Sequence, residues 1–251
     1  MERRQRLQRL GERGDQGRVR LVVLSLCLSA ATALAQDGRK SGYEYMSRQT
    51  QAMQDDEATG PAVLALLDGE ALWKRDCAGC HKQGMKGVAT RYPALYRGKL
   101  VDLEQRVNLC RVERQKAQPF PYESRELLAL TAFIGRQSRG LPIEVSADPA
   151  AGKAFFLKRQ GQLNLSCANC HDDNPGRKLG GSVIPQGHPT GYPIYRLEWQ
   201  GMGSLQRRLR SCLAGMRAEN YALGSPELVE LELYLMSRAR GMKLETPAVR
   251  P

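Results

Sequence analysis

The pentapeptide Cys77-Ala78-Gly79-Cys80-His81 and its second copy, Cys167-Ala168-Asn169-Cys170-His171, decide the fold of this 251-residue chain. CxxCH is the attachment motif of a c-type haem: the thiols form thioether bonds to the haem, and the adjoining His becomes an iron ligand. The alternative, a zinc site built from both CxxC pairs, would not require a His after each pair. We therefore expect two covalently bound haem c groups, attached at Cys77, Cys80, Cys167 and Cys170, with His81 and His171 on the irons.

The segments around the two pentapeptides repeat each other. Gly69-Glu-Ala-Leu-Trp73 precedes the first copy, and Gly152-Lys-Ala-Phe-Phe156 precedes the second. Beyond them, 92–97 corresponds to 192–196, 103–110 to 205–212, 124–128 to 225–229 and 139–144 to 240–245. Such self-similarity indicates a duplicated structural unit.

Each unit ends in a segment with helical periodicity. Ser124 and Ser225 are predicted N-caps, and the apolar residues that follow are spaced for buried helix faces: Leu127, Leu130, Phe133 and Ile134, then Leu228, Leu231, Leu233, Tyr234 and Leu235. No segment alternates with the period of a strand. We expect an all-α fold of two tandem class I cytochrome c-like domains, over 63–145 and 146–251, after an irregular leader over 36–62 and with a joint at 141–151.

Residues 1–35 have the pattern of a secretory signal peptide. Seven Arg lie between Arg3 and Arg20, a 15-residue apolar run follows from Leu21 to Ala35, and Ala33-Leu34-Ala35 is an A-x-A cleavage site. The run is short for a membrane span, although an uncleaved anchor is the alternative. We expect cleavage near Ala35 and a periplasmic protein without a membrane anchor. The net charge of +12 comes from scattered basic residues, which do not indicate nucleic-acid binding.

Cys110 and Cys212 hold equivalent places in the two repeats, where a cytochrome c domain supplies its distal iron ligand. We expect Cys110 to pair with His81 and Cys212 with His171, as low-potential thiolate ligands. A disulfide between the two Cys is the alternative in an exported protein. Other ligand candidates are weak: Met85 follows His81 too closely, and His188 is more simply a solvated or packing residue. Met202, Met216 and Met242 have no consistent partner in the first repeat and are expected in the core.

An Arg lies four residues before each of these Cys, on the same helical face: Arg106 before Cys110 and Arg208 before Cys212. A guanidinium near a reactive sulfur suits an oxyanion, which it can bind through two parallel hydrogen bonds. The alternative role for either Arg is a haem-propionate partner or a solvated helix charge. We expect Arg208 to be the oxyanion-binding residue.

The haem pair, the two Cys-bearing helices, GHPTGYPIYRLEWQ at 187–200 and RSCLAGMRAE at 210–219 resemble the SoxA family of dihaem cytochromes, over about residues 40–245. The resemblance implies an L-cysteine S-thiosulfotransferase that joins thiosulfate oxidatively to a cysteine of the carrier SoxYZ, with electrons leaving through haem to a cytochrome c. It implies a monohaem partner, SoxX. It also implies that Cys212 is the active-site ligand, carried as a persulfide, that Arg208 binds substrate, and that Cys110 ligates the first haem.

Two other functions remain open on the sequence. A thiosulfate dehydrogenase would form tetrathionate, but its electron-exit haem is expected to have a Met ligand. A plain dihaem electron carrier would not be expected to hold two low-potential, Cys-ligated haems. The paired Cys argue against both alternatives.

Overall fold

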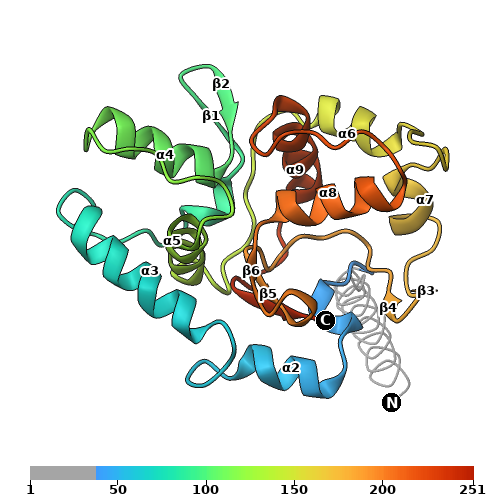
Figure 1. Ribbon diagram of the computed structural model, residues 1–251, viewed down its shortest axis with the longest axis horizontal. Coiled ribbons are helices and arrows are strands. Elements are labelled where there is room, and N and C mark those ends of the chain that lie inside the picture. The colour runs from blue at the N-terminus through green and yellow to red at the C-terminus, as the bar shows by residue number, and fades with distance from the viewer. Residues whose placement is uncertain (1–37) are drawn as a thin grey trace, which may run out of the picture. The chain divides into compact units, whose positions relative to one another are not determined.

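The computed structural model describes residues 38–251, in which residues 40–251 form one compact unit. The signal peptide predicted over 1–35 lies outside the described residues. The α-helices of the described part are α2 (Arg48–Asp55), α3 (Val63–Asp76), α4 (Leu103–Glu113), α5 (Arg125–Arg136), α6 (Ala150–Leu157), α7 (Cys167–His171), α8 (Leu205–Gly215) and α9 (Pro226–Arg238) (Figure 1). No helix within residues 38–251 is long and apolar enough to cross a membrane.

A crossed helix pair forms the frame of each repeat: α3 packs on α5, and α6 packs on α9. A glycine stands at each crossing. A methyl group on Gly69 would collide with the Ala129 carbonyl of α5, and one on Gly152 with the Glu230 carbonyl of α9. The glycines therefore let the two backbones of each pair approach closely, which explains why both copies of the sequence carry Gly at this position.

The terminal helices begin at the predicted caps. Ser124 accepts a hydrogen bond from the backbone N–H of Leu127 at the start of α5, and Ser225 accepts one from Leu228 at the start of α9. The predicted apolar faces are buried, with Leu127 and Leu228 both fully inaccessible to solvent. The helical fold class predicted from the sequence is confirmed.

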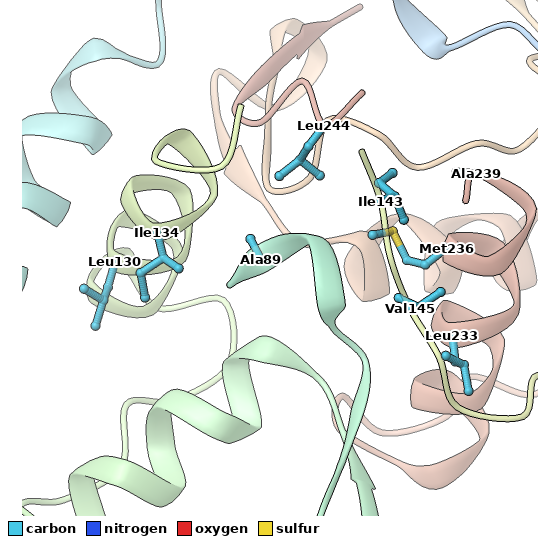
Figure 2. Packing of buried hydrophobic residues seen from close by; sticks show 9 residues of the cluster. All are labelled: Ala89, Leu130, Ile134, Ile143, Val145, Leu233, Met236, Ala239 and Leu244. Carbon is cyan, nitrogen blue, oxygen red and sulfur yellow. The ribbon is translucent and has the colours of Figure 1, made fainter. Parts of the chain in front are cut away.

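One hydrophobic cluster is shared by the two repeats. It joins Leu130 and Ile134 of α5 to Leu233 and Met236 of α9 through a segment that carries Ile143 and Val145 (Figure 2). Ile143 and Val145 are 0% and 1% exposed, so the predicted joint at 141–151 begins as core and not as a surface linker. The boundaries between 63–145 and 146–251 stay a prediction, because the core does not divide there.

The ends of the two repeats pair with each other almost symmetrically. The N–H of Gly140 donates to the Leu244 carbonyl, and the N–H of Leu244 donates to the Leu141 carbonyl. The N–H of Glu144 donates to Thr90 in the first repeat, and the N–H of Glu245 donates to Thr190 in the second. Each repeat thus fixes the loop that carries Thr90 or Thr190 through the same residue of its terminal segment.

Short strands and 3-10 turns complete the fold. The turns are η1 (Gly42–Tyr45), η2 (Ala89–Arg91) and η3 (Leu197–Trp199). Antiparallel pairs join β1 (Ala94–Tyr96) to β2 (Lys99–Val101) and β3 (Lys178–Leu179) to β4 (Ser182–Val183). A three-stranded sheet has the order β6 (Gly201–Gly203), β5 (Ile194–Arg196), β7 (Ala248–Arg250), with β5 and β7 parallel. Strands of two or three residues are too short to show an alternating pattern, so the sequence did not predict them.

The prediction of an irregular leader over 36–62 is wrong for part of this range, because it contains η1 and α2. Ser47 caps α2 by accepting a hydrogen bond from the Thr50 N–H. Gln54, only 5% exposed, accepts a hydrogen bond from the Val249 N–H of β7. This contact with a distant strand stabilises a helix of eight residues, which is too short to be stable alone.

Candidate haem and thiol site

The second pentapeptide forms the short helix α7, which positions His171. Ser166 caps α7 with a capping box that also uses Asn169. The Nδ1 atom of His171 lies 2.7 Å from the Pro185 carbonyl oxygen and is the donor there, since a carbonyl only accepts. Gly187, with φ +75°, lies so close that a methyl group would be 3.4 Å from the ring. The loop after α7 therefore fixes the imidazole and leaves Nε2 for another partner.

The His171 ring also meets Cys212. The Cys212 thiol lies within hydrogen-bonding distance of the His171 ring and is near Cys167 and Cys170. Burial pushes the pKa of Cys212 upward, but the hydrogen bond to His171 and the guanidinium groups of Arg208 and Arg196 outweigh it, so the pKa lies below its usual value. Residues 167–171 and Cys212, distant in sequence, are thus brought together, and the environment of Cys212 favours a thiolate.

The Arg residues before the two Cys differ in their surroundings. Arg106 is engaged: its guanidinium stacks 4.3 Å from the Tyr96 ring centroid and hydrogen-bonds Tyr92. Arg208, on α8, acts electrostatically on Cys212 and on Tyr192, but its guanidinium makes no hydrogen bond or ion pair within the described chain. The guanidinium beside Cys110 is thus held by two tyrosines, whereas the guanidinium beside Cys212 has no hydrogen-bonding or ion-pair partner in residues 38–251.

The first repeat assembles its residues less completely. Cys110, on α4, lies close enough to Cys77 to act on its ionisation: burial raises the pKa of Cys77 to about 11, and Asp76 and Cys110 add to the rise. The His81 ring makes no hydrogen bond among residues 38–251, and it is not held against Cys110 as His171 is held against Cys212. Cys80 is exposed.

All six Cys of the described chain carry free thiols, so the structure contains no disulfide between Cys110 and Cys212. No group of three or more His, Cys, Asp or Glu in residues 38–251 has the arrangement of a metal site. Burial also raises the pKa of Cys167 to about 12.

The other ligand candidates are structural. His188 is 9% exposed, and its Nδ1 lies 2.8 Å from the Lys40 carbonyl oxygen, so it is a packing residue. Met216 is buried in the core of the second repeat, and Met85 and Met242 pack against the shared cluster.

Sequence reasoning missed Tyr192 and Arg196, which the structure adds to the surroundings of Cys212. It also missed Pro185 as the partner of His171. Both Tyr192 and Arg196 belong to a repeated segment, and the signal was a small difference between the copies. The second copy is one residue shorter before its Arg. In the first repeat the two residues Arg97-Gly98 connect the strands, whereas in the second repeat four residues, Leu197–Gln200, connect them.

The residues of the second repeat fit a c-type haem. Two free thiols stand one helical turn apart on α7, the imidazole is pinned at Nδ1 with Nε2 unused, and a thiol with lowered pKa faces it. An iron held between an imidazole and a thiolate needs this donor set. A pinned Nδ1 is the usual second contact of a metal-bound His.

Comparison with known proteins agrees with this geometry. The family model described as "SoxA/TsdA, cytochrome c domain" matches residues 68–143 and 151–244. The chain is similar to the L-cysteine S-thiosulfotransferase subunit SoxA of Pseudaminobacter salicylatoxidans, with 33% identity over 84% of this chain and 80% of that one. It is similar to SoxA of Rhodovulum sulfidophilum, with 34% identity over 85% and 81%.

A solved structure is similar as well. The crystal structure of SoxXA from P. pantotrophus aligns with a TM-score of 0.81 and 33% identity, covering 85% of this chain and 87% of that one. The family model covers the segments that contain both pentapeptides and both later Cys. Taken with the His171–Cys212 pair, these matches establish that the chain belongs to the SoxA family of L-cysteine S-thiosulfotransferase subunits.

Proposed function

We propose that this chain is the catalytic, dihaem subunit of an L-cysteine S-thiosulfotransferase that joins thiosulfate to a cysteine of a SoxYZ-type carrier. The observation that carries the proposal is the meeting of Cys212, His171 and the unengaged guanidinium of Arg208. The names of the relatives support the same activity. The dehydrogenase and the plain electron carrier remain alternatives that the experiment below distinguishes.

Haem c would be held at two places. In the first repeat Cys77 and Cys80 would form the thioethers, with His81 and Cys110 on the iron. In the second, Cys167 and Cys170 would form them, with His171 and Cys212 on the iron. When bound, such a haem accepts electrons one at a time and passes them on.

Arg208 has the first role in the reaction. Thiosulfate is a dianion, and a guanidinium with unused donors can bind its sulfonate oxygens through parallel hydrogen bonds. This contact orients the sulfane sulfur toward Cys212, whose lowered pKa keeps its sulfur nucleophilic. The Pro185 contact keeps the His171 ring in place beneath it.

The overall reaction balances as an oxidation. A carrier thiol and thiosulfate give a carrier S-thiosulfonate, with one new sulfur–sulfur bond, and one proton and two electrons are released. Cys212 holds the thiosulfate sulfur before the carrier thiol takes it, so the Cys212 thiol is restored. The two electrons require acceptors beyond a single one-electron centre.

A partner is therefore part of the proposal. The similar crystal structure from P. pantotrophus is that of SoxXA, which supports a monohaem SoxX-type cytochrome as the partner of this chain. A cytochrome c would take the electrons onward. We propose the periplasm as the compartment, because the segment over 1–35 has the pattern of an export signal.

The test is turnover of thiosulfate by the purified dihaem chain with its SoxX-type partner and carrier. We expect carrier S-thiosulfonate, detected by intact mass, together with cytochrome c reduction. Cys212→Ala is expected to abolish this turnover, and the matched Cys110→Ala to disturb only the first haem spectrum and retain much of the activity. Tetrathionate formed without carrier would favour the dehydrogenase, and electron transfer without any thiosulfate chemistry would favour the electron carrier.

A further inference from the structure

Arg196 is the last residue of β5, whereas Arg97, the Arg that follows the matching Tyr-Pro segment of the first repeat, lies in the turn after β1. Its side chain belongs to β5 and is 8% exposed as a residue, whereas the Arg97 side chain is 61% exposed and pairs with Glu113 at a turn with φ 51°. The difference follows from the place of each Arg, because Arg196 pairs with Gly201 at the end of its strand ladder, where the first repeat has Tyr96 paired with Lys99. The first repeat turns at once into β2, while the second inserts η3 before β6.

The inserted residues hold Arg196 in place. Glu198 accepts hydrogen bonds from Nε at 2.8 Å and from Nη2 at 2.6 Å. The Trp199 ring lies under the guanidinium, 5.1 Å from centroid to Cζ, and Arg207 of α8 stacks on the same ring at 4.1 Å. A methyl group on Gly203 would collide with the Trp199 ring, so β6 closes the remaining side.

This arrangement leaves part of the Arg196 guanidinium available. Nε and one hydrogen-bond site of Nη2 are used by Glu198, and no interaction of Nη1 occurs within the described chain. The charge of the Arg196 guanidinium lowers the pKa of Cys212 and of Tyr192. The charges of Arg208 and Arg250 lower the pKa of Tyr192 as well. Arg250, in contrast, is engaged by Gln54 and Glu245.

We propose that Arg196 is a second oxyanion-binding residue beside Cys212, and that Trp199 and Glu198 position it for thiosulfate. This inference rests on the proposed function. Arg208 on a helix and Arg196 on a strand approach one thiol from different elements, so two guanidinium groups meet the two negative charges of thiosulfate. A buried, rigidly held guanidinium loses little freedom on binding, which favours it over a flexible surface cation.

The first readout is equilibrium binding of labelled thiosulfate to the oxidised, haem-loaded complex with its cytochrome partner, measured beside kcat and KM with the carrier. Arg196→Met is expected to raise the Kd and KM for thiosulfate about tenfold or more, as for the loss of a charge-assisted contact. Trp199→Ala is expected to raise both values less, and Trp199→Phe to restore them, because a phenyl ring keeps the stacking surface. Arg97→Met is the matched control and is expected to leave both values unchanged.

The second readout is the reduction potential of each haem, with haem content and circular dichroism as checks on folding. If Arg196→Met binds thiosulfate normally and shifts only the second haem's potential, Arg196 is a haem-propionate partner and the inference is wrong. Unchanged binding and potential would also overturn it. If Arg196→Met fails to fold, the comparison of Trp199→Ala with Trp199→Phe decides, and equal Kd values in that pair reject the positioning role. A wild-type complex that neither binds nor consumes thiosulfate would overturn the proposed function itself.

Discussion

At the scale of single residues, the two repeats differ where the sequence makes them look alike. Arg106 and Arg208 both lie four residues before a Cys on a helix. Arg106 is occupied by two tyrosines, while the Arg208 guanidinium has no hydrogen-bonding or ion-pair partner anywhere in residues 38–251. The Arg208 side chain is half-buried and none of its donors is sealed from solvent, so its guanidinium is open to an anionic ligand, whereas Arg106 is held by its tyrosines.

This difference predicts the outcome of a matched pair of variants. Arg208→Ala is expected to lower kcat/KM for thiosulfate by about one to two orders of magnitude, since it removes a charge-assisted contact. Haem content and the spectrum of the second haem should persist, because Arg208 is not a ligand. Arg106→Ala is expected to retain catalytic efficiency within a factor of about two, as its role is to pack on tyrosines. Equal losses in the two variants would contradict the assignment of substrate binding to Arg208 and not to Arg106.

At the scale of elements, each repeat depends on one close helix crossing. Gly69 of α3 meets the backbone of α5, and Gly152 of α6 meets the backbone of α9. Backbone atoms cannot move aside as a flexible side chain can, so any Cβ here must separate the helices.

We therefore expect Gly69→Ala and Gly152→Ala each to lower the free energy of unfolding by about 1–3 kcal/mol or more, through overpacking. Urea denaturation of the haem-loaded protein measures this. Gly215→Ala, at the end of α8, is the control: a methyl group there meets nothing within 4 Å, and stability should change by less than ~0.5 kcal/mol. Neutral behaviour of the two crossing variants would mean that the helices can separate without cost.

At the scale of the whole molecule, a group of carboxyls lies between the two repeats, with Asp102 fully buried and Glu104 and Glu232 half-buried. Asp102, the fully buried N-cap of α4, accepts hydrogen bonds from Gln206 of α8 at 2.7 Å and from Tyr122 at 3.2 Å. Glu232 of α9 lies 3.3 Å from the same amide of Gln206. Burial raises the pKa of Asp102 to about 6, and burial together with Asp102 raises the pKa of Glu104 to about 8. Burial and these two carboxyls raise the pKa of Glu232 as well.

These raised pKa values predict how stability depends on pH. Because the folded-state pKa values exceed the unfolded ones, the stabilisation is complete below the ordinary values of 3.8 and 4.5 and is lost as pH rises through about 6 and then about 8. The free energy of unfolding of the haem-loaded protein, from urea denaturation at several pH values, should fall across this window. Glu104→Gln should flatten the fall, and Glu126→Gln, on an exposed position of α5, should not. An identical slope in all three proteins would exclude the cluster as its cause.

The sequence by itself determined the features that depend on nearby residues or on exact repetition. The pentapeptides, the Ser caps of α5 and α9, the apolar helix faces and the places of Cys110 and Cys212 all follow from local spacing, and the helical fold and the family follow from them. Local spacing suffices because a cap or a helix face involves residues within one or two turns.

Only the tertiary structure decided which Arg of each repeated segment has partners for its guanidinium. Arg208 and Arg196 lie beside Cys212 because α8, β5 and η3 meet there, and Arg106 and Arg97 are occupied because their own neighbours differ. Three other features likewise depend on partners far away in the sequence: the cluster of carboxyls between the repeats, the helix α2 held by Gln54, and the buried joint at Ile143. Burial and electrostatics are properties of the packed surroundings of a side chain, and a repeat that copies the sequence does not copy those surroundings.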